Sequence, residues 1–357
     1  QEETKQEETK QEEKAPEAEV EVKSVFDVEV TDEMKEAAKE FSVSLITDTG
    51  GIDDRSFNQG TWEGVQKFSK LTGAKINYTQ SNSDADYIPN LSTASEDQHN
   101  LIIATGFLFF DSITEVSKAF ADQHYLLIDS VVEAPNVASA VFAEEQGSFL
   151  VGVAAAQSAK EAGKNIVGFI GGGDFDLIQK FEAGYEAGVH AVDPNMEVKI
   201  EYVGDFSNAG KAQVLAKKMY DEGAHVIYHA AGGAGNGLFK EATDRRLAGQ
   251  EVWVIGVDRD QYEVGIYDKE AGKSSTLTSM VKRVDVASFT TAMMSLKGEF
   301  PGGQVLVFDM KNGGIDIPAE NPNMSEESIK LVNEMKEKVK SGELEVPTVP
   351  NRIKNKQ

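Results

Sequence analysis

Three aspartates stand at the ends of apolar segments of strand length. Asp48 ends SLITD, Asp129 ends YLLID and Asp258 ends WVIGVD. One such aspartate is usually a helix cap or a turn residue, but three in equivalent places favour a shared purpose. Carboxylates accept hydrogen bonds from N–H and O–H donors, and they repel phosphate. The pattern therefore predicts a site for a neutral, donor-rich ligand, such as a sugar, a nucleoside or an amide, rather than a nucleotide.

Two glycine-rich segments, GFIGGGDF and HAAGGAGNG, follow apolar runs and could bind an anion through backbone N–H groups. Neither has the dinucleotide-binding spacing. Counted from Gly171, the third required glycine is Asp176, and counted from Gly233 it is Leu238. The segment GKSS resembles the end of a P-loop, but Tyr267 occupies the place of the first glycine. The glycines either let the backbone approach a ligand or permit tight turns, and both interpretations stay open.

Short apolar segments alternate with amphipathic stretches of helical period along most of the chain. Strands are predicted at 41–47, 75–79, 100–105, 125–129, 137–142, 165–171, 198–203, 224–230, 251–258, 275–280, 304–309 and 314–317. Such alternation indicates an α/β fold with parallel sheets covered on both faces. About a dozen strands fit two sheets of about six. A (β/α)₈ barrel is the alternative, disfavoured because there are too many strands for eight units.

A long helix rich in small residues, predicted to begin at residue 144, marks the passage from one αβ series to the next. We expect lobe 1 to comprise 41–143 and 276–309, and lobe 2 to comprise 144–275 and 310–353, with several hinge strands between them. Ligands of open parallel sheets bind outside the carboxyl ends of the strands. The three aspartates are therefore predicted to face a cleft between the lobes.

Two aromatic residues stand near these strand ends. Phe57 falls in the first turn of a predicted helix, and Tyr228 falls near the end of a predicted strand in lobe 2. An aromatic side chain from each lobe could stack on both faces of a planar ring, at about 1–3 kcal/mol for each contact by analogy with base stacking. The alternative for Phe57 is a core position, because it shares a helical face with Val65, Phe68 and Leu71.

Composition excludes several classes of protein. The chain of 357 residues has a formal net charge of −25, which argues against nucleic acid or an anionic lipid surface as a partner. Cysteine is absent, so disulfides, thiolate metal sites and a cysteine nucleophile are excluded. Residues 1–24 open with QEETKQEETKQEEK and are predicted to be a disordered acidic linker, either a functionless tail or a tether.

Enzymes and regulators of similar architecture remain as alternatives. A nucleoside hydrolase would also place aspartates at strand ends, with one as general base. The sequence contains no GxSxG, HExxH or Walker motif, and the four-residue spacing of His225 and His229 on a strand is more often structural than metal-binding. We therefore expect no enzyme activity, no cofactor and no metal. The effector-binding core of a transcription regulator would need a basic helix-turn-helix, and a sensor domain could share the same pocket.

Four motifs, SLITDTGGIDDRSFNQGTWEG, IIATGF, VIYHAAGGAGNG and WVIGVDRDQ, together resemble the basic membrane lipoprotein family of bacterial substrate-binding proteins, in particular its purine nucleoside receptors. The resemblance runs from about Phe41 to Ile353. It implies a type I periplasmic-binding fold with two doubly wound parallel-sheet lobes, and a monomer that delivers guanosine, inosine or adenosine to an ABC transporter permease. It also implies an extracytoplasmic protein anchored to the outer face of the cell membrane by a lipidated amino-terminal cysteine, which we expect to have been removed from this chain.

The resemblance also implies roles for individual residues on the base side of a nucleoside. Phe57 and Tyr228 would form the two faces of a purine clamp, although the family commonly has phenylalanine where Tyr228 stands. Asp48, Asn58 and Asp129 would read the edge of the base.

On the ribose side, the resemblance implies that Asp258, Lys282 and the backbone of Gly232 and Gly233 hold the hydroxyl groups. Without the resemblance, Lys282 would be taken for a solvated lysine. Ligand would then bridge the lobes and shift the population from open to closed.

Overall fold

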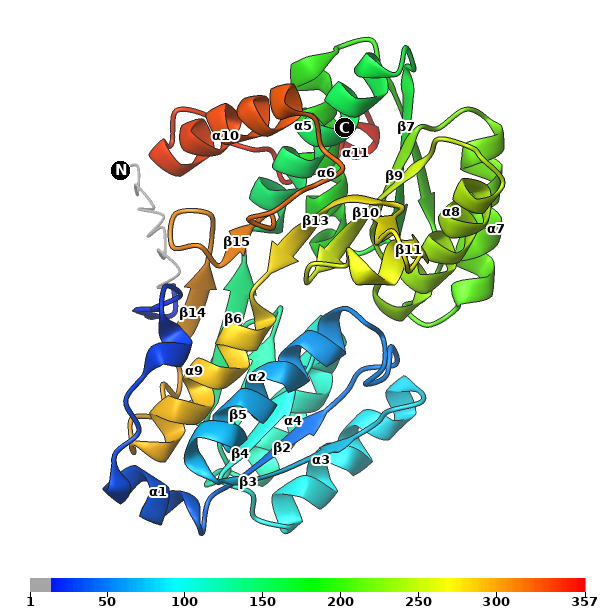
Figure 1. Ribbon diagram of the computed structural model, residues 1–357. Helices are drawn as coiled ribbons and strands as arrows, with labels where there is room; N and C mark the ends of the chain where they lie inside the picture. The colour runs from blue at the N-terminus through cyan, green and yellow to red at the C-terminus, as the bar shows by residue number, and fades with distance from the viewer. Residues whose placement is uncertain (1–13, 357) are drawn as a thin grey trace, which may run out of the picture.

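The computed structural model describes residues 14–356, which form two α/β lobes (Figure 1). Lobe 1 contains a seven-stranded sheet in the order β1-β14-β6-β5-β4-β2-β3, and all its strand pairs are parallel. Its strands are β1 (Glu17–Ala18), β2 (Ser42–Ile46), β3 (Lys75–Thr79), β4 (Leu101–Ala104), β5 (Tyr125–Ile128), β6 (Val137–Phe142) and β14 (Val305–Phe308). The central strands are apolar and buried because helices cover both faces.

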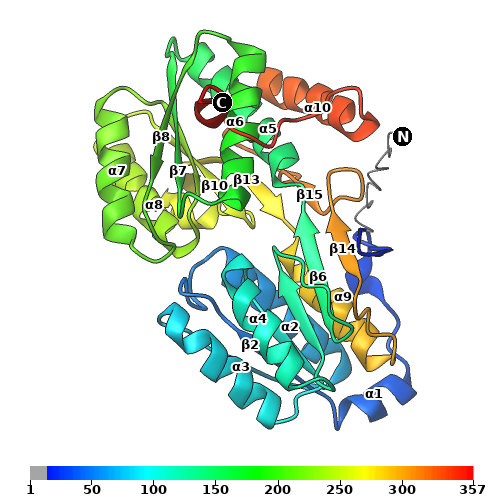
Figure 2. The same cartoon turned by 180° about the vertical axis from the view of Figure 1, so that it is seen from behind.

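Helices α2 (Phe57–Thr72) and α9 (Val284–Leu296) cover one face of this sheet, with α1 (Asp32–Ala38) beside them (Figure 1). Helices α3 (Tyr87–Glu96) and α4 (Phe110–Ala119) cover the other face, as Figure 2 shows from behind. Separate apolar clusters fill the two interfaces between helices and sheet. Lobe 1 is thus a three-layer sandwich whose strands point their carboxyl ends toward the second lobe.

Helix α2 crosses α9 closely because Gly64 lies at the contact. A Cβ atom at Gly64 would stand 2.1 Å from the carbonyl oxygen of Asp285 and 2.2 Å from Oγ of Ser288. The same Ser288 hydroxyl donates to the carbonyl of Thr61 at 2.7 Å, which ties the two helices together. The small residue at position 64 therefore sets the distance between α2, which begins at the cleft, and the α9 helix behind it.

Substituting Gly64 by alanine is expected to lower the free energy of unfolding by about 1–2 kcal/mol. Overpacking costs about 1–3 kcal/mol, and the better helix propensity of alanine offsets up to about 1 kcal/mol of it. Urea unfolding measures the change. Gly210→Ala is the matched control, since the nearest atom to a Cβ there is Oδ1 of Asn208 at 3.6 Å. Equal stability of the two variants would contradict the prediction.

Lobe 2 contains a six-stranded sheet in the order β15-β13-β10-β9-β7-β8, parallel except for the pair of β13 with β15. Its strands are β7 (Ile166–Gly171), β8 (Glu197–Tyr202), β9 (Val226–Ala230), β10 (Trp253–Asp258), β13 (Thr276–Lys282) and β15 (Ile315–Asp316). A small antiparallel pair joins β11 (Ile266–Asp268) to β12 (Lys273–Ser274). Short 3-10 helices occur in both lobes, at Val25–Asp27, Asp84–Asp86 and Phe107–Phe109 in lobe 1 and at Gly232–Gly235 and Glu263–Gly265 in lobe 2.

Helices again form layers on the sheet of lobe 2. They are α5 (Glu144–Glu161), α6 (Asp176–Val192), α7 (Ala209–Asp221), α8 (Asn236–Leu247), α10 (Glu326–Ser341) and α11 (Asn351–Lys354). Helices α5 and α6 pack tightly, because a Cβ atom at Gly152 would lie 2.4 Å from the carbonyl oxygen of Tyr185 and one at Gly188 would lie 2.0 Å from that of Phe149. The small residues of the predicted long helix thus serve a close helix crossing.

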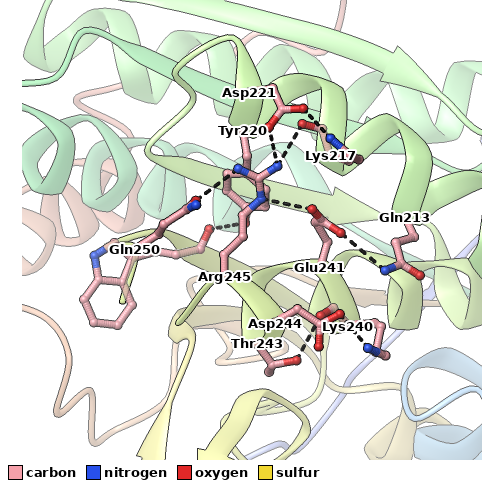
Figure 3. A network of polar contacts seen from close by, with 11 residues as sticks. Gln213, Lys217, Tyr220, Asp221, Lys240, Glu241, Thr243, Asp244, Arg245 and Gln250 are labelled. Carbon is pink, nitrogen blue, oxygen red and sulfur yellow. Dashed lines mark hydrogen bonds and ion pairs between the residues drawn. The ribbon is translucent and has the colours of Figure 1, made fainter. Parts of the chain in front are cut away.

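The opposite face of lobe 2 carries α7 and α8, which a polar network joins on its outer side (Figure 3). Arg245 donates to Glu241 at 3.0 Å, to Asp221 at 2.7 Å and to the carbonyl of Lys217 at 3.2 Å. It also donates to the side chain of Gln250 at 3.1 Å. One guanidinium group therefore links both helices to the loop that follows α8.

The chain passes between the lobes after β6, after β13 and after β14, which confirms the predicted α/β fold with doubly wound lobes and hinge segments. One boundary needs correction. The prediction assigned 276–309 to lobe 1, but β13 pairs in parallel with β10 and so belongs to the sheet of lobe 2. Lobe 1 resumes with α9 instead. A strand signal alone does not say which sheet the strand joins.

The amino-terminal segment also differs from its prediction where it is described. Of the predicted disordered linker 1–24, residues 1–13 lie outside the described residues. Strand β1 pairs with β14, and the carbonyl of Pro16 accepts from the N–H of Val305 at 2.9 Å. Backbone pairing with the open edge of β14 therefore fixes a segment whose composition favours disorder. Within residues 14–356 no helix has the length and apolar character needed to cross a membrane.

Candidate ligand-binding site

A cavity lies between the carboxyl ends of the two sheets, where ligands of open parallel sheets bind. Both lobes line it. Lobe 1 contributes Asp48, Gly50, Asp54, Phe57, Asn58, Phe107 and Asp129, and lobe 2 contributes Leu177, Ile178, Phe181, Phe206, Ala230, Gly232, Val257, Asp258 and Lys282. Acidic side chains and phenylalanine rings therefore dominate a wall with one lysine.

The structure brings the three strand-end aspartates together in this cavity. Asp48 follows β2, Asp129 follows β5 and Asp258 ends β10. Asp129 and Asp258 both have left-handed backbones, with φ of 71° and 70°, a conformation rare for residues other than glycine. Matching strain at equivalent positions of the two sheets is typical of functional sites.

A fourth carboxylate, Asp54, also lines the cavity. Asp54 caps α2: its Oδ1 accepts from the N–H of Ser56 at 2.9 Å and of Gln59 at 3.1 Å, and its Oδ2 accepts from the N–H of Asn58 at 2.7 Å. The same residue therefore starts the helix that carries Phe57 and adds negative charge to the wall of the cavity.

Asn58 lies between two of these carboxylates. Its Nδ2 donates to Oδ1 of Asp48 at 2.7 Å and to Oδ2 of Asp54 at 3.0 Å, and its Oδ1 accepts from the N–H of Asp48 at 3.2 Å. Both amide hydrogens are thus engaged within the protein. Asn58 orients Asp48, whose Oδ1 also accepts from the N–H of Gly50 at 2.9 Å.

Burial raises the pKa of several cavity acids. It raises the pKa of Asp48 to about 6 and that of Asp54 to about 7, against hydrogen bonds from Asn58 and the backbone. Burial also raises the pKa of Asp258, although Lys282 and the hydroxyl of Ser56 oppose the shift. That hydroxyl, at the start of α2, donates to Oδ2 of Asp258 across the cleft.

Lys282 is the cation at the base of the cavity and is 2% exposed. Its Nζ lies 2.7 Å from Oδ1 of Asp129 and 3.1 Å from Oε1 of Glu144. Burial lowers the pKa of Lys282, but Asp129, Glu144 and Asp258 outweigh it and hold the pKa above its usual value. Glu144 is fully buried, also pairs with Lys180 at 2.6 Å, and was not foreseen from the sequence.

Tyr228 does not line the cavity, so its predicted place in a clamp is wrong. Its side chain is fully buried, its hydroxyl lies 2.9 Å from Oγ of Ser148, and its ring packs against Phe169 and Tyr185. Side chains two residues apart in a strand share a face. Ala230, at the end of β9, lines the cavity, while Tyr228 lies one repeat deeper in the core.

Phenylalanines from other elements face Phe57 across the cavity. Phe181 comes from α6, and Phe206 follows β8. Phe206 stands three residues beyond the predicted strand 198–203, so a search for aromatics just after the strand ends could have found it. Phe107 follows β4 and its ring centroid lies 6.1 Å from that of Phe206, so the rings meet across the cleft.

The glycines divide between the cavity and the contact of the lobes. Gly232 lines the cavity with φ of 54°, whereas Gly233 does not line it. A Cβ atom at Gly233 would lie 3.2 Å from the carbonyl oxygen of Gly50, so Gly233 lets the two lobes touch. Gly106, with φ of 125°, passes beside Phe57, whose Cε1 would lie 3.3 Å from an added Cβ atom.

The two histidines of β9 and its approach do not form a metal pair. His229 is fully buried, its Nε2 lies 2.9 Å from Oε1 of Gln261, and burial lowers its pKa to about 4. Among residues 14–356, no group of three or more histidine, cysteine, aspartate or glutamate side chains is arranged to hold a metal ion.

Comparisons with known proteins agree with this geometry. The chain is 42% identical over 324 residues to the CD4+ T-cell-stimulating antigen of Listeria monocytogenes, covering 88% of this chain and 90% of that protein. It is 37% identical to the ABC transporter nucleoside-binding protein BmpA of Lactococcus lactis, covering 87% and 90%. An ABC transporter solute-binding protein of Aeropyrum pernix superposes with a TM-score of 0.77 at 26% identity, covering 86% and 93%.

Residues 41–349 match the family described as ABC transporter substrate-binding protein, PnrA-like. Members of this family are extracytoplasmic, membrane-associated proteins that bind a substrate and deliver it to a permease, typically without enzymatic activity. The match spans both lobes and all the cavity residues. The chain belongs to the PnrA-like family of ABC transporter substrate-binding proteins.

Proposed function

We propose that this protein captures purine nucleosides, namely guanosine, inosine or adenosine, in the interlobe cavity and delivers them to an ABC permease. The observation that supports the proposal most is that four carboxylates and phenylalanine rings from both lobes line one cavity. The description of the Lactococcus lactis relative as nucleoside-binding supports the same ligand class.

Each part of a nucleoside has a partner of suitable chemistry. Ribose hydroxyls and base N–H groups donate hydrogen bonds, which the carboxylates of Asp48, Asp129 and Asp258 can accept. The purine ring is planar and can stack between Phe57 and Phe206, or against Phe181. A phosphate group would meet several carboxylates and one lysine already paired with Asp129, so nucleotides should be rejected.

Calorimetric titration with guanosine, inosine, adenosine, guanosine monophosphate, guanine and ribose tests the proposal. We expect the nucleosides to bind, the monophosphate to bind far more weakly, and the isolated base and sugar to bind more weakly than the whole nucleoside. Chromatography after hours of incubation should return each nucleoside unchanged. Binding of guanosine monophosphate as tight as that of guanosine would overturn the carboxylate argument, and release of free base would indicate an enzyme.

Affinity for guanosine is expected to fall as the pH is lowered through about 6, approaching tenfold per pH unit for each carboxylate that must be ionised. Donors of the ligand bind the ionised form of Asp48, whose pKa in the free protein is about 6, so protons compete with the ligand below that pH. Titrations between pH 8 and 5 measure the profile, with circular dichroism to verify folding. Asp48→Asn should make the profile less steep rather than flat, because burial also raises the pKa of Asp129 to about 6. A constant affinity of the parent protein over this range would contradict the role of Asp48.

We also propose that the protein acts as a monomer held at the outer face of the membrane by an amino-terminal lipid. Its place in a family of membrane-associated receptors supports this arrangement. Light scattering coupled to gel filtration tests the monomer, and incorporation of labelled palmitate into the precursor in its own cells tests the lipid. A stable dimer or an unlabelled precursor would contradict the respective part.

A further inference from the structure

Two side-chain amides of lobe 2 reach across the cleft to consecutive carbonyl groups of lobe 1. Nε2 of Gln261 donates to the carbonyl of Arg55 at 2.7 Å, and Nδ2 of Asn236 donates to the carbonyl of Asp54 at 3.1 Å. Neither Gln261 nor Asn236 lines the cavity. The contacts therefore join the lobes without being part of the ligand-facing wall.

The side chain of Gln261 is held in one orientation by other hydrogen bonds. Its Oε1 accepts from the N–H of Val257 at 2.9 Å and lies 2.9 Å from Nε2 of His229. Nδ1 of His229 accepts from the N–H of Ala231 at 3.3 Å, which places the ring proton on Nε2. Since Oε1 is occupied by two donors and the residue is 1% exposed, the amide hydrogens must point to the carbonyl of Arg55.

Asn236 is anchored just as firmly, because it is the first residue of α8. Its Nδ2 also donates to the carbonyl of Gly233 at 3.0 Å. A Cβ atom at Gly237 would lie 1.9 Å from the carbonyl oxygen of Ala209, so α8 begins in tight contact with α7. At the other end of the helix, the Arg245 network of Figure 3 fixes α8 to α7 again.

The loop that receives these two hydrogen bonds, together with the first turn of α2, carries most of the lobe 1 residues that line the cavity. Arg55 has φ of 58°, a left-handed conformation that a side chain disfavours. The loop runs from Asp48 to Ser56, and Phe57 follows it as the first residue of α2. The hydrogen bonds that hold the carbonyl groups of Asp54 and Arg55 against lobe 2 therefore also restrain the cavity residues of this loop.

We propose that Gln261 and Asn236 are positioning residues: they hold the 48–56 loop against lobe 2 and so slow the release of bound ligand without touching it. The choice of guanosine as probe rests on the proposed function, whereas the effect on the separation of the lobes does not. An exposed ion pair between the lobes differs from these two partly buried hydrogen bonds. Arg259 and Glu63 form an ion pair of 2.8 Å with side chains 34% and 39% exposed, and such pairs contribute little.

Stopped-flow measurement of guanosine dissociation tests the proposal with Gln261→Met and Asn236→Ala. Each substitution removes the donor that crosses the cleft, and Gln261→Met also removes the acceptor of Val257 and His229. Both should raise the dissociation rate constant by about threefold to tenfold, with a smaller change in the association rate constant. Arg259→Met is the matched control and should change the dissociation rate constant by less than about twofold. If Gln261 and Asn236 served folding alone, the variants would be less stable, but the dissociation rate constant would not change more than the association rate constant.

The separation of the lobes is measured independently of any ligand. The chain has no cysteine, so spin labels on Lys70→Cys in lobe 1 and Lys218→Cys in lobe 2 are site-specific. Distance distributions of the free protein should shift toward longer separations in Gln261→Met and Asn236→Ala, and not in Arg259→Met. If the parent protein does not bind guanosine, the proposed function fails while this measurement still decides the inference.

Unchanged distances and unchanged dissociation in both variants would overturn the inference. Gln261 lies in the interior, so circular dichroism must first show that Gln261→Met folds. If it does not fold, Asn236→Ala alone decides, because Asn236 is partly exposed at a helix start and its replacement leaves the interior of lobe 2 intact.

Discussion

Replacing Lys282 by methionine is expected to lower the free energy of unfolding at pH 7 by about 3–5 kcal/mol, because the substitution leaves the buried carboxylate of Asp129 without its ion-pair partner and takes one of two lysines from Glu144. Nζ of Lys282 lies 2.7 Å from Asp129 and 3.1 Å from Glu144, and both acids are buried. Methionine retains much of the length of the side chain but not its charge. Nucleoside binding should also weaken, since Lys282 and Asp129 both line the cavity.

Urea unfolding at several pH values separates this electrostatic effect from simple loss of packing. Without Lys282, Asp129 and Glu144 should take up protons in the folded protein at a higher pH than in the unfolded chain. Stability gained from such acids is present at low pH and is lost as the pH rises through the folded pKa. The deficit of Lys282→Met should therefore shrink between pH 7 and pH 5.

Lys217→Met serves as the control for the lysine substitution. The side chain of Lys217 is 62% exposed and pairs with Asp221 on the same helix, so its loss should change stability by less than about 0.5 kcal/mol. A deficit for Lys282→Met that did not depend on pH would point to packing alone. A deficit no larger than that of the control would show that the buried ion pairs do not need this lysine.

The fold was predictable from the sequence because its central strands are apolar runs separated by turns and amphipathic helices. Strand ends were predictable too, and in an α/β sheet these ends meet at one edge, so Asp48, Asp129 and Asp258 converge as expected. The sheet to which β13 belongs was not predictable, because pairing of β13 with β10 depends on contacts far apart in the chain.

The sequence also did not predict how deeply each side chain of lobe 2 lies below the cavity wall. Tyr228 and Ala230 share one face of β9, and the local pattern does not show that the wall of the cavity begins only at Ala230. Glu144 was missed because its partners, Lys180 and Lys282, are remote in sequence. The amide of Asn58 is taken up by Asp48 and Asp54, a network that no spacing rule reveals.

Replacing Phe57 by alanine is expected to weaken guanosine binding by about 1–3 kcal/mol, roughly a 5-fold to 150-fold rise in Kd, if its ring stacks on the base. Phe57 lines the cavity in the first turn of α2 and is only partly buried. Hydrogen bonds of Asp54 and Ser56, not the side chain of Phe57, fix the start of α2. Calorimetric titration should therefore show a large change in affinity, while urea unfolding shows a modest change in stability.

Phe206 is tested as the lobe 2 partner of Phe57 by comparison with Tyr228, which does not line the cavity. Phe206→Ala should weaken binding about as much as Phe57→Ala, because both rings line the cavity from opposite lobes. Tyr228→Phe removes only the hydroxyl bonded to Ser148, so it should cost about 1 kcal/mol of stability and leave Kd within about twofold. If Tyr228→Phe weakened binding as strongly as Phe206→Ala, the cavity wall would have to extend along β9 as far as Tyr228, which would then contact the ligand. If neither phenylalanine mattered, the ligand would be held by the carboxylates alone, as expected for a sugar without a base.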